Sequence, residues 1–164
     1  RSVAAVFFPG GFGTLDEGYE GLTLLQTGKS LPRPVILMEA PGGDYWTRWV
    51  KYIEEVMLEM NYISPDDLGL YKICHSADEA VGIINHFYKN YHSLRYIDDL
   101  TVLRLHEQIS DQALATLNEE FADIIVNGKI EKAEASSVEK KQRDNARKPR
   151  LVFEFNKMNF ASPS

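Results

Sequence analysis

The stretch VAAVFFPGGFGTLDE, residues 3–17, decides the fold of this chain. Its first residues are apolar without interruption, which predicts a strand buried on both faces, as in a parallel sheet. Pro9 cannot donate a hydrogen bond to a neighbouring strand, so we expect the strand to end there. A glycine-rich turn then leads into a helix. This order of strand, turn and helix is the arrangement with which α/β proteins hold a phosphate.

The turn contains Gly10, Gly11 and Gly13, which allow backbone angles and close approaches that a Cβ would block. Several amide N–H groups can therefore point at one anion. Thr14 is a suitable N-cap for the helix, and Glu17 then stands at the N3 position of a capping box. Glu17 thus has two interpretations, a helix cap and a functional carboxylate. The glycines fit either a ligand loop or a tight turn without a ligand.

The helix that begins at Thr14 is expected to run to about Thr27, because apolar residues recur at helical spacing and Gly28 is a natural C-terminal stop. Glu17 and Glu20 are three residues apart in this helix. That spacing places both carboxylates on one side of the helix, near the glycine turn. Glu20 also fits an ordinary solvated helix face.

The pattern P-G-G-x-G-T-x-x-E over residues 9–17 closely resembles the signature of the LONELY GUY (LOG) family, and Glu20 and the helix end at residues 26–29 extend the match. Members of that family are phosphoribohydrolases of cytokinin riboside 5'-monophosphates and related nucleotides. The family has long carried the label "possible lysine decarboxylase". The resemblance runs from about residue 3 to about residue 91, and the segment after it is similar to the tail of longer bacterial members.

The resemblance implies roles for six residues: phosphate binding by Gly10, Gly11, Gly13 and Thr14, and catalysis by Glu17 with Glu20 assisting. It also implies a homodimer or a higher homo-oligomer, with the active site at the subunit boundary. The family's catalytic arginine lies on a helix upstream of the first strand. Arg1 adjoins the strand itself, so we do not assign that role to it.

The fold class that we expect is α/β, with a Rossmann-like doubly wound parallel sheet. Such a sheet needs strands on both sides of its phosphate-binding crevice, and this chain has too few before Pro9. We therefore expect residues 1–91 to be the C-terminal portion of the nucleotide-binding domain, with an N-terminal portion missing from the chain. Residues 34–38 and 71–74 predict two further strands, with helices over about 44–60 and 76–88.

After about residue 91 the alternation of strand and helix stops, and we expect a small appended α+β module over residues 92–164. Residues 100–105 and 150–155 predict strands, and residues 110–126 predict an amphipathic helix. Between them, residues 131–148 are polar and mixed in charge, which predicts a loop. Its basic residues fit a solvated surface or an anion-binding arm.

Composition limits the classes of partner and site. No apolar run approaches the ~20 residues of a membrane helix, so we expect a soluble protein without a membrane partner. A net charge of −6 argues against a nucleic-acid binder, and the single cysteine, Cys74, fits the reducing cytoplasm. The histidines show no metal-ligand spacing with one another or with Cys74, so we predict no metal site.

The function that we expect is hydrolysis of the N-glycosidic bond of a nucleoside 5'-monophosphate, either AMP or an N6-modified AMP-like nucleotide. The products are free base and ribose 5-phosphate. A non-catalytic protein that binds a nucleotide or another phosphorylated ligand is the alternative, because binding needs only the glycine loop. A literal decarboxylase would need pyridoxal phosphate on a lysine. No lysine stands in a context typical of such a site, and we predict no cofactor.

Overall fold

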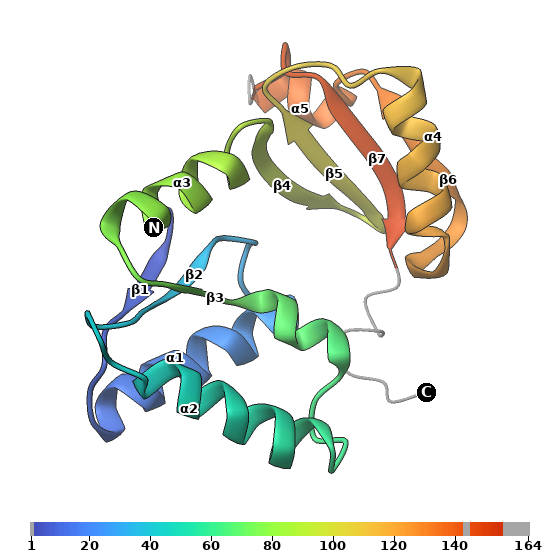
Figure 1. Cartoon of the computed structure of the whole chain (residues 1–164). Helices are drawn as coiled ribbons and strands as arrows, with labels where there is room; N and C mark the ends of the chain where they lie inside the picture. Colours follow the sequence, from blue (N-terminus) through green and yellow to red (C-terminus); the bar gives the residue numbers. More distant parts are fainter. Residues whose placement is uncertain (1, 143–144, 156–164) are drawn as a thin grey trace. The chain divides into compact units, whose positions relative to one another are not determined.

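The computed structural model describes residues 2–142 and 145–155 (Figure 1). The chain divides into two compact units, with the boundary between Phe87 and Tyr88. The sequence places the corresponding boundary between residues 91 and 92. Within the described ranges, no helix is long and apolar enough to cross a membrane. Each unit has its own sheet, and the two are described separately.

The first unit contains a sheet of three parallel strands in the order β1-β2-β3. Their bounds are β1 Ala5–Phe7, β2 Val35–Met38 and β3 Lys72–Cys74. Leu37 of the central strand pairs with Phe7 on one side and Ile73 on the other. β1 ends before Pro9, as expected for a residue that lacks a backbone donor.

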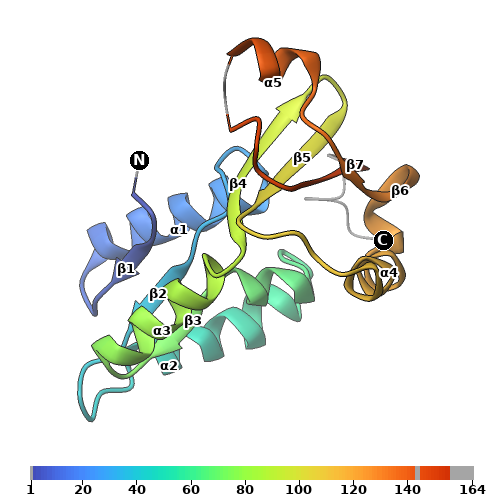
Figure 2. The same ribbon diagram turned by 90° about the horizontal axis from the view of Figure 1, so that it is seen from above.

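Helices cover both faces of this sheet (Figures 1 and 2). Val35 and Leu37 of β2 pack on the side of α1 and α2, whereas Ile36 between them packs on the side of α3. This alternation is the two-residue period of a strand. The helices of the unit are α1 Phe12–Gln26, α2 Tyr45–Tyr52, the π-helix η1 Ile53–Leu58, the 3-10 helix η2 Pro65–Leu70 and α3 Ala77–Phe87.

In the described sheet, β1 is more exposed than the sequence predicts. β1 pairs with β2 and lies at one edge of the order β1-β2-β3. Its central residue, Val6, is 41% exposed, so the burial of this strand on both faces is not found among the described residues. The parallel strands and the helices on both faces agree with an α/β arrangement. The larger doubly wound sheet stays a prediction.

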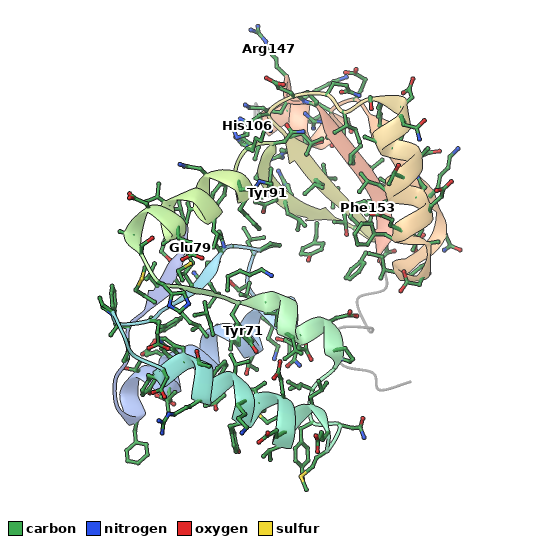
Figure 3. All side chains as sticks on the ribbon, in the orientation of Figure 1. Tyr71, Glu79, Tyr91, His106, Arg147 and Phe153 are labelled. Atoms are coloured by element: carbon green, nitrogen blue, oxygen red, sulfur yellow. The ribbon has the colours of Figure 1, made fainter. Side chains whose placement is uncertain are left out.

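α3 begins with a variant of the capping box, as the order Ser76-Ala77-Asp78-Glu79 predicts. The Glu79 N–H donates to Ser76 Oγ at 3.2 Å, as a capping box requires. The Glu79 carboxylate accepts from the N–H of His75 at 2.8 Å, one residue before the usual donor. Figure 3 labels Glu79 at this end of α3.

The second unit contains a four-stranded antiparallel sheet in the order β4-β5-β7-β6. Its strands are β4 Tyr91–Ile97, β5 Leu100–Leu105, β6 Ile125–Ala133 and β7 Arg150–Phe155, and its helices are α4 Asp111–Glu120, the 3-10 helix η3 Ala122–Ile124 and α5 Ser137–Gln142. β5 and β7 agree with the sequence prediction, whereas β4 and β6 are additional. The segment 131–148, predicted as a loop, contains the end of β6 and α5.

Three buried charged side chains join α5 to the sheet of this unit. Arg104 of β5 lies directly opposite Arg150 of β7, and Glu139 of α5 contacts both. The Glu139 carboxylate is 2.8 Å from Arg104 Nη2 and 2.6 Å from Arg150 Nη1. Burial by itself raises the pKa of the Glu139 carboxyl, but the hydrogen bonds from Arg104 and from the Ser136 N–H, with the charge of Arg150, hold that pKa below its usual value.

Arg150 also organises the basic segment that follows α5. Its guanidinium donates to the backbone carbonyls of Asn145, Ala146 and Lys148 at 2.9 to 3.2 Å. These bonds fix the backbone around Arg147, whose side chain extends outward near α5 (Figure 3). The described part of this segment is therefore held by a buried side chain.

Candidate functional site

The glycine loop lies between the carboxyl end of β1 and the N-terminus of α1. α1 begins at Phe12 with Gly11 as its N-cap, three residues earlier than the sequence predicts. The N–H groups of Thr14 and Leu15 both donate to the Gly11 carbonyl, at 3.1 and 3.3 Å. The prediction of Thr14 as N-cap is therefore wrong, because the glycine backbone starts the helix without a side-chain cap. The N-terminus of α1, with its partial positive charge, lies directly at the glycines.

The glycines of the loop differ in what surrounds them. A Cβ on Gly10 would overlap Thr14 Oγ1, so this position is occupied by the threonine hydroxyl and needs a glycine. A Cβ on Gly11 or Gly13 would meet nothing within 4 Å. Packing therefore accounts for the first glycine, while the space beside the other two is open to a ligand.

The structure places Glu17 and Glu20 exposed on α1. Glu17 is the sixth residue of the helix, so it cannot close a capping box at the N3 position. Leu15 and Leu22 of the same helix pack against the core, on the side away from the two carboxylates. Both carboxylates thus share an accessible face, with Glu17 about one and a half helical turns and Glu20 about two turns after the glycine loop.

Tyr45, which the sequence analysis did not single out, contacts the glycine loop. It is the first residue of α2, in the connection that follows β2. Its hydroxyl donates to the Gly10 carbonyl at 2.7 Å. The carboxyl ends of neighbouring parallel strands lie at one edge of a sheet. Because the glycine loop follows β1 and Tyr45 follows β2, this rule could have predicted that the two lie close together.

Glu39 positions the start of α2. Its side chain is buried, with 2% exposure, and its Oε2 accepts from the N–H of Trp46 at 2.7 Å and of Thr47 at 3.4 Å. Asp44 stands at the N-cap position, where a local side chain would be expected to take this role. The Asp44 side chain makes no capping hydrogen bond and accepts instead from Arg48 Nε at 2.7 Å. A carboxylate from the preceding strand therefore replaces the expected local cap.

A separate cavity of about 170 Å³ lies beside the C-terminal half of α1. Its lining includes Tyr19, Trp49 and Tyr71, and the Trp49 Nε1–H donates to the Tyr19 hydroxyl at 2.9 Å. Figure 3 labels Tyr71 on the side of the sheet that faces α2. Trp49 and Tyr71 pack with the core of the first unit, and the described residues that line the cavity include none from the glycine loop. They are not part of the candidate site.

Among its described residues, the first unit has no buried lysine for a pyridoxal phosphate site. Such a site needs a lysine held near the cofactor. The lysines of the first unit, Lys29, Lys51 and Lys72, are all exposed. Cys74 is fully buried, and burial together with the charge of Glu79 raises the pKa of its thiol, which disfavours a nucleophilic role. In the ranges that the structure describes, no group of His, Cys, Asp and Glu side chains could hold a metal ion.

Comparison with protein families identifies the family of the first unit. The family described as "Possible lysine decarboxylase" matches residues 1–84, which is just over half of the chain and lies within the first unit. No curated protein matches the chain. The matched range includes the glycine loop, both carboxylates of α1, Glu39 and Tyr45.

Proposed function

The chain belongs to the family of possible lysine decarboxylases, and from this premise we propose that it is a phosphoribohydrolase of nucleoside 5'-monophosphates. The substrate is AMP or an N6-modified AMP-like nucleotide. Water adds to C1' of the ribose, the C1'–N bond breaks, and the base leaves with a proton. The observation that carries the proposal is the start of α1 at the glycine loop, with Glu17 free of a capping role on the accessible face.

The 5'-phosphate binds at the glycine loop in this proposal. The N-terminal amides of α1 and the helix dipole favour an anion there. Gly11 and Gly13 leave open space beside the backbone, and the Thr14 side chain lies against Gly10 at the same point. A phosphate can therefore approach the amides without meeting a side chain at either glycine.

Glu17 supplies the negative charge that glycosidic cleavage requires. The transition state has oxocarbenium-like positive charge on the ribose, which a nearby carboxylate stabilises. Glu17 acts through hydrogen bonds to the ribose hydroxyls or by activating water, and Glu20 assists from the next turn. The two carboxylates approach the ribose from the exposed face of α1.

The test is the substitution Glu17→Gln in the full-length protein, with Asp16→Asn as the control. Asp16 is exposed on the same helix and directly precedes Glu17, a spacing at which two side chains do not face each other, although its spacing of four residues from Glu20 places it beside that carboxylate. We expect kcat for base release to fall by about 100-fold or more in Glu17→Gln, because a catalytic carboxylate contributes on that order. Asp16→Asn should keep normal turnover. Full activity of a folded Glu17→Gln protein would contradict the catalytic role.

The substrate class is tested with a panel of nucleoside monophosphates and the matching nucleosides, with free base and ribose 5-phosphate followed by chromatography. Release of base from monophosphates and not from nucleosides supports the proposal. Binding of AMP without release of adenine over long incubation would instead indicate a nucleotide-binding protein. A homodimer or higher homo-oligomer is proposed with this function, since the LOG family that the chain resembles places its active site at a subunit boundary.

A further inference from the structure

The peptide between Gly10 and Gly11 is held by a side chain from another element. The Tyr45 hydroxyl donates to the Gly10 carbonyl at 2.7 Å. A trans peptide is planar, and its C=O and N–H point in opposite directions. Because the Gly10 carbonyl points toward Tyr45, the Gly11 N–H points away from the tyrosine.

This peptide is the one in the loop that rotates most easily. Both flanking residues are glycines, which adopt positive and negative φ at similar cost. A rotation of the Gly10–Gly11 peptide would exchange the positions of its N–H and its C=O. The oxygen would then take the place of a donor at the N-terminus of α1, and its partial negative charge would oppose an anion.

The tyrosine is itself well placed to prevent this rotation. The buried Glu39 carboxylate fixes the start of α2 by accepting from the N–H groups of Trp46 and Thr47. The Tyr45 ring packs edge-to-face against Trp46, with 4.8 Å between ring centroids, and Trp46 is 2% exposed. The hydroxyl therefore extends from a rigid base toward the loop.

We propose that Tyr45 is a positioning residue that holds the Gly10–Gly11 peptide with its N–H available to the phosphate of the substrate. This inference rests on the proposed function only for the identity of the ligand, a nucleoside 5'-monophosphate. The Tyr45 hydroxyl, from α2, thus supports the backbone of a site that is otherwise formed by β1, the glycine loop and α1. Tyr45 acts on binding of the phosphate and has no part in the chemical step.

The experiment compares Tyr45→Phe with Tyr52→Phe in the full-length protein. Tyr52 is an exposed tyrosine on the same helix and serves as the matched control. Calorimetry gives Kd for AMP, inorganic phosphate and adenosine, and steady-state kinetics gives KM and kcat for base release. We expect Kd for AMP and phosphate, and KM for AMP, to rise about three- to tenfold in Tyr45→Phe, because one neutral hydrogen bond is lost. The adenosine Kd and kcat should stay within about twofold of the wild-type values by the same argument, and Tyr52→Phe should match wild type.

The adenosine measurement separates positioning of the phosphate from general loosening of the fold. Equal weakening of all three ligands, or an unchanged Kd for AMP, would overturn the inference. If wild type binds AMP but releases no adenine, the hydrolase proposal fails, while the Kd values still decide the role of Tyr45. If wild type binds neither AMP nor phosphate, no phosphate site exists for Tyr45 to position, and both proposals fall.

Discussion

Gly10 and Gly13 show how one motif can hold glycines for two different reasons. The Thr14 side chain occupies the space where a Cβ of Gly10 would lie. Gly13 is the second residue of α1, and the space beside it is empty. A helical glycine that no contact requires costs up to about 1 kcal/mol relative to alanine. We infer that Gly13 is retained for the ligand and Gly10 for the loop itself.

This difference predicts opposite effects on stability. Gly13→Ala should keep or raise the free energy of unfolding, by up to about 1 kcal/mol. It should also weaken AMP binding, because the new methyl group takes space that the phosphate needs. Gly10→Ala should lower the free energy of unfolding by about 1 to 3 kcal/mol through overlap with Thr14. Urea unfolding and calorimetry with AMP measure both effects. Wild-type AMP affinity in Gly13→Ala would show that the open space is not the phosphate site.

At the scale of the element, α2 depends on a capping group outside its own sequence. Asp44 occupies the N-cap position, yet its carboxylate is exposed and contacts Arg48. Glu39 reaches the helix N-terminus from the end of β2 and satisfies two of its backbone donors. Gly43 lies close to the Glu39 side chain, since a Cβ at position 43 would meet Glu39 Oε1 at 3.1 Å. The turn between β2 and α2 is therefore built around the glutamate.

We expect Glu39→Ala to lower the free energy of unfolding by about 2 kcal/mol, because it leaves backbone N–H groups of α2 without their acceptor. Asp44→Ala should change it by no more than about 0.5 kcal/mol, the usual value of an exposed ion pair one turn apart on a helix. Denaturant unfolding of both variants gives the comparison. A larger effect for Asp44→Ala than for Glu39→Ala would show that the local residue is the functional cap.

At the scale of the whole molecule, the two units are stabilised by different kinds of interaction. The family match and the candidate site lie in the first unit, whose core joins β2 to helices on both sides. The second unit combines an apolar core around Leu105, Ile130 and Leu151 with the buried cluster of two arginines and Glu139. Two arginines directly opposite each other on neighbouring strands repel. The unit therefore depends on the Glu139 carboxylate between them.

This cluster predicts a loss of stability in acid. The pKa of the Glu139 carboxyl is lower in the folded protein than in the unfolded chain. Its contribution is therefore present above the unfolded pKa and is lost as pH falls through the lower folded pKa. Glu139→Gln should destabilise the protein by about 3 to 5 kcal/mol at neutral pH, because two buried guanidinium groups lose the negative charge of Glu139.

Urea unfolding of Glu139→Gln and wild type, at neutral pH and at about pH 3, measures this contribution. The difference between the two proteins should shrink in acid, because the unfolded wild-type chain takes up a proton at this carboxyl before the folded protein does. Glu134→Gln is the control, since Glu134 is an exposed glutamate of the same unit. A difference between Glu139→Gln and wild type that does not change with pH would show that the charge of Glu139 is not what stabilises the unit.

Local pattern predicted those parts of the fold in which the signal lies within one element. The apolar run before Pro9 and the run at 34–38 predicted β1 and β2, and helical spacing predicted α1 through to its C-terminal end. The sequence also identified the glycine loop and the two carboxylates of α1 as candidates. Pattern missed β4, β6 and α5, and in α5 the charged Glu139 is buried through its pairing with Arg104 of β5. A polar residue that is buried with a partner has the same local signal as one on the surface.

The sequence by itself determined that the chain carries a glycine loop between a strand and a helix, followed by two carboxylates one turn apart, because this order and spacing are properties of neighbouring residues. Only the tertiary structure decided how that loop is supported. The capping of α2 by Glu39 depends on the turn between β2 and α2, and the bond from Tyr45 to Gly10 depends on which strand ends lie side by side. A hydrogen bond between Tyr45 and Gly10 joins residues far apart in the chain, and folding of the parallel sheet is what brings them together.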